Sequence, residues 1–135
     1  MTTATAWQST LEQEHAAVYG YGLIGGQLGP DSVLARTGLE LHRARRDQCA
    51  AAIVQLGELP VAARPAYDPV TPVTGPASAR QLAAAIERDC AARYAELAAQ
   101  PDVPTRMFGA QWLRVSAIQS TRWTSQIPAL PGIES

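Results

Sequence analysis

The sequence contains no lysine and no asparagine, and all 11 of its basic residues are arginine. Acidic residues number 12, so the formal net charge is −1. A protein that binds nucleic acid or an anionic membrane needs a basic patch, which this balance does not supply. We therefore expect no nucleic-acid and no membrane partner. Arginine used to the exclusion of lysine is typical of a G+C-rich bacterial genome.

Cysteine and long hydrophobic runs are also scarce. Cys49 and Cys90 are too few for a disulfide scaffold or a zinc motif. No apolar run approaches the roughly 18 residues that a membrane span needs. The N-terminal stretch lacks the basic and apolar regions of a secretory signal. These features predict a soluble, cytoplasmic protein, and 135 residues predict a single domain over residues 1–135.

Alanine and helical apolar spacing are abundant, and together they predict an all-α fold. The expected helices cover about residues 5–28, 32–57, 77–100 and 105–124. Between the second and third helices, residues 58–76 carry five prolines and form a crossover without helix. A C-terminal tail follows over residues 125–135.

Each expected helix has an apolar stripe that defines its inward face. The first stripe is Trp7, Leu11, Glu14, Val18, Tyr21, Gly25 and Leu28. The second is Ala35, Leu39, His42, Arg46, Cys49, Ile53 and Leu56. The third is Leu82, Ile86, Asp89 or Cys90, Arg93 or Tyr94, and Leu97. The fourth is Phe108, Gln111 or Trp112, Val115, Ile118 and Arg122.

Glycines inside the first helix call for a structural reason. Gly20, Gly22, Gly25 and Gly26 each cost roughly 0.5–1 kcal/mol relative to alanine in a helix. Close approach of a neighbouring helix or a second subunit offsets such a cost. We therefore expect a homodimer, in which the glycine-rich face and surplus aromatic side chains take part.

The connections determine the direction of the helices. The 19-residue crossover can reach about 60 Å, whereas a 24-residue helix rises about 36 Å. It can therefore run the length of the bundle, which gives helix directions of up, down, down and up. A four-helix bundle with one long crossover is the ferritin-like arrangement.

Several segments also carry a family resemblance: EHAAVYGYG, HRARRD, a crossover that ends in PVTGPASA, and a last helix that closes on RW. Together they resemble a bacterial, mostly actinobacterial, ferritin-like family of unknown function. The resemblance extends from about Trp7 to Gly132. It implies the bundle architecture and no assigned activity.

The usual chemistry of a ferritin-like bundle is a di-iron centre, which needs a glutamate from two helices and a Glu-x-x-His pair from the other two. Glu14 fits the first helix, and Glu87 or Asp89 fits the third. In the second helix, Glu40 is followed three residues later by Arg43 where histidine is needed. The fourth contains no aspartate, glutamate or histidine. The sequence therefore predicts that this centre is incomplete.

We expect a buried polar network in its place. Glu14, His42, Arg46 and Asp89 fall at similar heights when helices are built at 1.5 Å per residue. The guanidinium of Arg46 would pair with the carboxylates of Glu14 and Asp89. An alternative is a single Fe or Mn ion held by Glu14, His42 and Asp89.

Three functions follow from these alternatives. The first is a non-enzymatic binding or structural module without cofactor. The second is a metal-dependent oxidoreductase with an atypical Fe or Mn site. The third is a binder of small apolar ligands, with a pocket near Tyr21 and the crossover.

Overall fold

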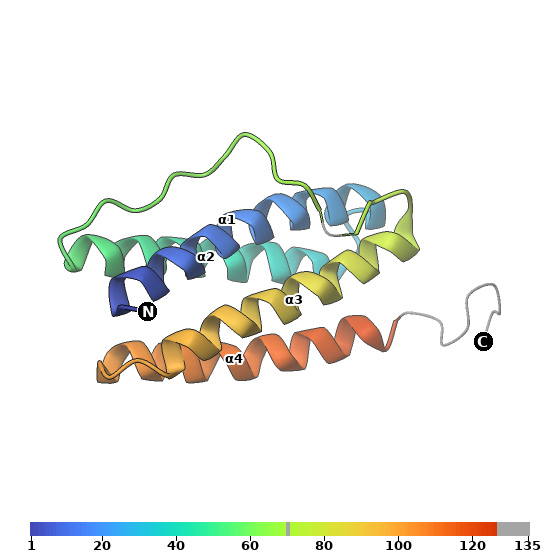
Figure 1. Ribbon diagram of the computed structural model, residues 1–135. Coiled ribbons are helices and arrows are strands. Elements are labelled where there is room, and N and C mark those ends of the chain that lie inside the picture. Colours follow the sequence, from blue (N-terminus) through green and yellow to red (C-terminus); the bar gives the residue numbers. More distant parts are fainter. Residues whose placement is uncertain (70, 127–135) are drawn as a thin grey trace.

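The computed structural model describes residues 1–69 and 71–126. Its helices are α1 (Thr3–Leu28), α2 (Val33–Gln55), α3 (Pro76–Ala98) and α4 (Val103–Thr124). They lie side by side in an all-α bundle (Figure 1). The expected tail over residues 125–135 lies mostly outside the described residues. In the described part of the chain, no helix combines the length and hydropathy needed to cross a membrane.

Local hydrogen bonds explain where the helices begin. The side chains of Thr2, Ser32 and Asp102 accept from the backbone N–H three residues later, at 3.1, 3.2 and 3.1 Å. The first helix therefore begins at Thr3, two residues before the expected start, because Thr2 is its cap. At the start of α3, the Ser78 hydroxyl accepts from the backbone N–H of Gly75 at 3.1 Å.

Two glycines mark where helices end. Gly29 follows α1 and Gly57 follows α2, and both have a φ of +80°, which favours glycine. The backbone N–H of Gly57 donates to Val54 at 2.9 Å, as expected for a residue that closes the last turn of a helix. The short turn after Gly29 returns the chain antiparallel to α1, since α1 and α2 pack against each other.

The crossover runs along α1 in the same direction as that helix (Figure 1). Near its start, the amide of Gln8 donates to the carbonyl of Leu59 at 2.7 Å and accepts from the N–H of Val61 at 2.9 Å. Two turns further along α1, the His15 Nε2 donates to the carbonyl of the same residue, Val61, at 3.0 Å. This segment therefore carries the chain back to the end where α3 begins.

The crossover gives α3 the same direction as α2, and the short turn before α4 reverses the chain again (Figure 1). The helix directions are up, down, down and up, as the sequence predicts. Within the bundle α1 packs against α2 and α3, and α3 packs against α4.

Glycines allow close helix packing at fewer positions than expected. Of the glycines in α1, Gly20 faces Ile86 of α3, whereas an added Cβ at Gly22, Gly25 or Gly26 meets nothing within 4 Å. A contact with the backbone of a neighbouring helix occurs instead at Gly109 of α4, where an added Cβ would collide with backbone atoms of α3. The homodimer expected from the glycine-rich face of α1 stays a prediction.

The fourth helix turns a different face inward from the one its apolar stripe predicts. Its buried residues are Thr105, Gly109, Ser116 and Trp123. The last three each lie one residue after an expected inward position, namely 108, 115 and 122. Gly109 explains the shift, because only a residue without a side chain lets α4 approach the α3 backbone so closely. Phe108 and Trp112 consequently flank the core and are half-buried.

A matched pair of glycine substitutions tests this packing. Gly109→Ala should lower the free energy of unfolding by about 1–3 kcal/mol, because the new methyl group meets α3 backbone that cannot move aside. Gly22→Ala should raise it by about 0.5–1 kcal/mol, because alanine favours the helix and the space is open. Urea denaturation measures both, and equal effects at the two positions would contradict the proposed contact.

Candidate functional site: a buried ionic network

Three ionisable side chains from three helices meet in the interior of the bundle. Glu14 of α1, His42 of α2 and Glu87 of α3 are all buried, with at most 1% of their surface exposed. The His42 Nδ1 lies 3.0 Å from the Glu14 Oε2, and its Nε2 lies 2.7 Å from the Glu87 Oε1. The imidazole is thus held between two carboxyl groups.

Neutral hydroxyl groups donate the remaining hydrogen bonds to both carboxyl groups. The Tyr94 hydroxyl donates a short hydrogen bond to the Glu14 Oε1. The Tyr21 hydroxyl donates to the Glu87 Oε1 at 3.0 Å, and the Ser116 hydroxyl donates to the Glu87 Oε2 at 3.1 Å. All four carboxylate oxygens therefore accept at least one hydrogen bond. We call this set the interior network; its members are Glu14, Tyr21, His42, Arg45, Glu87, Tyr94 and Ser116.

The geometry determines the charge of His42. Carboxylate oxygens accept hydrogen bonds, so both ring nitrogens that face them must donate, which only the imidazolium can do. Burial alone would lower the pKa of His42, but its contacts with Cys90 and Glu14 outweigh burial and raise the pKa well above its usual value. The raised pKa and the two facing carboxyl groups therefore favour the imidazolium form of His42.

The pKa values of Glu87, Tyr21 and Tyr94 are shifted in directions that suit their roles in the network. Burial alone would raise the pKa of Glu87, but the hydrogen bond and the charge of His42 hold it below its usual value. Burial, followed by the nearby carboxylates and other groups, raises the pKa of Tyr21 and Tyr94 well above the ordinary tyrosine value. Both phenols therefore remain protonated and act as donors.

Arg45 of α2 supplies the second buried positive charge. Its Nη1 donates to the Tyr94 hydroxyl at 3.1 Å and to the Ser116 hydroxyl at 3.4 Å, and its side chain is 1% exposed. The Arg45 Cζ lies 4.2 Å from the centre of the Trp112 ring, a cation–π contact. Two cations thus match the two carboxylates, which lowers the cost of burying these charges.

Aromatic packing holds the network in place. The Tyr21 ring stacks on the His42 ring with centroids 5.3 Å apart, and the Trp123 indole N–H donates to the Tyr21 hydroxyl at 3.0 Å. An added Cβ at Gly38 of α2 would collide with the Tyr21 ring. Gly38 therefore makes the room that lets Tyr21 reach the network.

The structure places the four residues predicted for the network in two groups. Glu14 and His42 are buried and in contact, as expected. Arg46 is instead 33% exposed, and its Nε donates to the neighbouring Asp47 at 3.1 Å. Asp89 is exposed, so it joins neither the predicted network nor the alternative Fe or Mn site with Glu14 and His42. Arg45 and Glu87 occupy the positions expected for Arg46 and Asp89.

Helix geometry explains why these two predictions were wrong. Residues 45 and 46 lie 60° and 40° to either side of His42 on a helix, so the stripe alone hardly separates them. The buried set of α2 includes Gly38 and Arg45, where the 4-3 spacing had selected Leu39 and Arg46. The small Gly38 opposite the large Tyr21 was the signal that could have identified the inward side. Glu87 was a sequence candidate for a metal ligand only, and Ser116 was missed.

A di-metal centre does not fit the donors of the interior. Such a centre needs four carboxylates and two histidines, whereas the described interior offers Glu14, Glu87 and His42, and α4 adds only the Ser116 hydroxyl. A smaller set of three side chains is closer to the arrangement that could hold a single metal ion. One atom each of Glu14, His42 and Cys90 lies within 4.8 Å of the other two, and all three residues are buried.

Fold and site thus define an all-α bundle with a buried ionic network. The chain belongs to a family described as "Domain of unknown function (DUF4439)", which matches residues 6–135. It is similar to a solved structure of a conserved hypothetical protein, rv2844, from Mycobacterium tuberculosis, with 29% identity and a TM-score of 0.89. The match covers 98% of this chain and 95% of that chain. No curated protein matches. Membership of a family of unknown function with an actinobacterial relative is thus confirmed, whereas the ferritin-like relationship expected from the sequence stays a prediction.

Paired arginine substitutions test the position of the network. Arg45→Met should lower the free energy of unfolding by about 3–5 kcal/mol, because it leaves two buried carboxylates with one cation. Arg46→Met should change it by less than about 0.5 kcal/mol, because Arg46 pairs only with exposed Asp47. Chemical denaturation of the two variants measures the difference, and a larger loss at Arg46 would restore the prediction made from the sequence.

Proposed function

We propose that this protein is a non-enzymatic, ferritin-like bundle that acts as a binding or structural module, with the interior network in place of a di-metal centre. The up-down-down-up order with one long crossover supports the ferritin-like relationship. Glu14 and Glu87 support it further, since a ferritin-like bundle carries one glutamate on each of two helices, facing the interior.

One observation carries the proposal. Every carboxylate oxygen of Glu14 and Glu87 already accepts a hydrogen bond from this chain, and both nitrogens of His42 face carboxylates. Bridging two metal ions would require these oxygens to give up their tyrosine and serine donors. Because these carboxylate oxygens and imidazole nitrogens are already paired, the arrangement favours packing and charge balance over di-metal oxygen chemistry.

Metal analysis tests the proposal directly. Protein purified from iron- and manganese-rich medium should contain far less than two equivalents of these metals per chain, and aerobic addition of Fe²⁺ should produce no catalytic iron oxidation. Elemental analysis and absorbance spectra measure the two results.

The matched control for this experiment is a pair of acid-to-amide variants. Two Fe or Mn ions per chain that disappear in Glu87→Gln and persist in Asp89→Asn would overturn the proposal, because Glu87 is buried and Asp89 is exposed.

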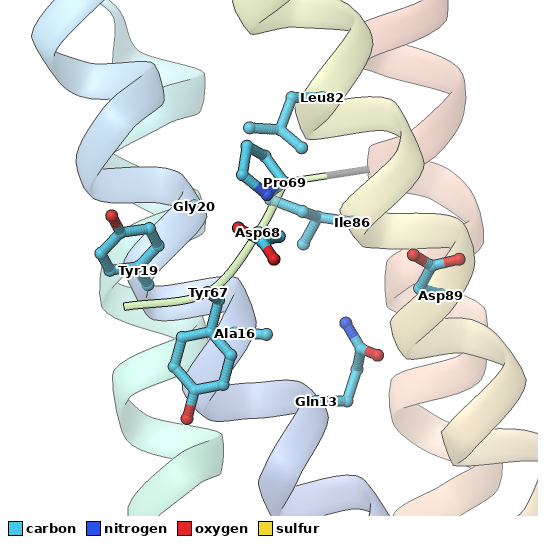
Figure 2. A pocket seen from close by; sticks show the side chains of 10 residues that line it. All are labelled: Gln13, Ala16, Tyr19, Gly20, Tyr67, Asp68, Pro69, Leu82, Ile86 and Asp89. Carbon is cyan, nitrogen blue, oxygen red and sulfur yellow. The ribbon is translucent and has the colours of Figure 1, made fainter. Parts of the chain in front are cut away.

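A second candidate function is the binding of a small, mainly apolar ligand in a groove between α1, α3 and the crossover (Figure 2). The groove has a volume of about 190 Å³, which suits a molecule of fragment size. Tyr19 and Tyr67 lie on one side with ring centroids 5.9 Å apart, while Leu82 and Ile86 supply the wall on α3. This groove is next to Tyr19. The pocket expected near Tyr21 and the crossover is found in part, because the pocket that Tyr21 lines lies between α1 and α2 and includes no crossover residue.

Thermal unfolding tests the second candidate. Indole-sized apolar fragments should raise the melting temperature of the parent protein in a concentration-dependent manner. Ala16→Leu should abolish this rise because it fills the groove, and Ala110→Leu on the exposed face of α4 should leave it unchanged. An equal rise in both variants would place ligand binding outside the groove.

A further inference from the structure

Cys90 is the one member of the buried Glu14–His42–Cys90 cluster that the interior network does not require. The three residues come from α1, α2 and α3, so the fold brings them together from distant parts of the sequence. Their oxygen, nitrogen and sulfur atoms lie within 4.8 Å of one another, and Cys90 has no exposed surface. The cluster therefore presents three different ligand types to one small region.

The mixture of donors indicates which kind of ion would fit. Zinc and similar borderline ions accept carboxylate, imidazole and thiolate together, at about 2.0–2.3 Å from the metal. Iron and manganese in ferritin-like centres depend instead on several carboxylates. A site that includes Cys90 is thus chemically distinct from the di-metal centre and from the Glu14, His42 and Asp89 site predicted from the sequence.

The second nitrogen of His42 strengthens this argument. Its Nε2 donates to the Glu87 Oε1 at 2.7 Å, and Glu87 is itself held by the Tyr21 and Ser116 hydroxyls. Histidines that bind metals commonly donate their other N–H to a carboxylate, which fixes the ring and makes it a better ligand. With Glu87 holding the Nε2 proton, the Nδ1 is the atom available to an ion beside Glu14 and Cys90.

We propose that Glu14, His42 and Cys90 bind one divalent, zinc-like ion in the interior of the bundle. Binding is an exchange: one ion enters as the His42 Nδ1 proton and the Cys90 thiol proton leave. The two positive charges of the ion replace those of the two protons, so the net charge of the buried region does not change. This balance matters because an uncompensated charge in a protein interior is costly.

Cobalt provides a direct probe of the thiolate ligand. Co²⁺ takes the same type of site as Zn²⁺, and a thiolate bound to Co²⁺ gives a charge-transfer band in the near ultraviolet. Protein treated with a chelator and then titrated with Co²⁺ should develop this band up to one equivalent per chain. Added Zn²⁺ should remove the band by displacement.

The two cysteines provide a matched pair of variants. Cys90→Ala should abolish the band, whereas Cys49→Ala should retain it, since Cys49 is equally buried and lies outside the cluster. Circular dichroism shows whether both variants remain folded. If Cys90→Ala does not fold, Cys90→Ser is the second variant, because it keeps the size of the side chain and cannot give a thiolate band.

The result that overturns the inference is distinct from the one that overturns the proposed function. A folded parent protein that shows no thiolate band with Co²⁺, or a band that persists in Cys90→Ala, would refute the zinc-like site. Two bridged Fe or Mn ions per chain would refute the non-enzymatic module instead. Each experiment can fail without the other.

Discussion

The imidazolium of His42 between the carboxylates of Glu14 and Glu87 is the interaction on which the interior depends. It joins α1, α2 and α3 at one point, where apolar packing alone would leave each carboxylate without a counter-charge. The remaining members of the network complete it. Hydroxyl groups donate hydrogen bonds to the carboxylate oxygens, and the positive charge of Arg45 makes the network neutral. A single polar cluster thereby determines which faces of the helices point inward.

This constraint also explains how α4, which has no acidic residue or histidine, participates in the site. Gly109 brings α4 against the backbone of α3, and that approach places Ser116 where it donates to Glu87. Further along, Trp123 reaches Tyr21. The contribution of α4 is thus to position neutral donors. Gly109 and Ser116 join α4 to the polar interior, as metal ligands on the fourth helix do in metal-binding bundles.

The sequence predicts the fold well and the site in part, for different physical reasons. Every helix boundary falls within two residues of the expected one, because proline, glycine and capping residues act locally. The inward side of a helix depends on its neighbours. The spacing around His42 selected Arg46, although Arg45 lies at a similar angle, and the stripe of α3 contained Asp89 or Cys90 and left out Glu87. Glu14 and His42 were identified because they lie at the centre of their stripes, where a rotation of some tens of degrees leaves a residue buried.

The crossover alongside α1 has a consequence for how the chain acquires its structure during synthesis. Gln8 and His15 are hydrogen-bonded to Leu59 and Val61, and Tyr19 packs against Tyr67, so residues made early depend on residues made some fifty positions later. The first helix therefore leaves the ribosome long before its outer side can be covered. α3 and α4, joined by a short turn, can pair as soon as both emerge, without waiting for a distant segment of the chain.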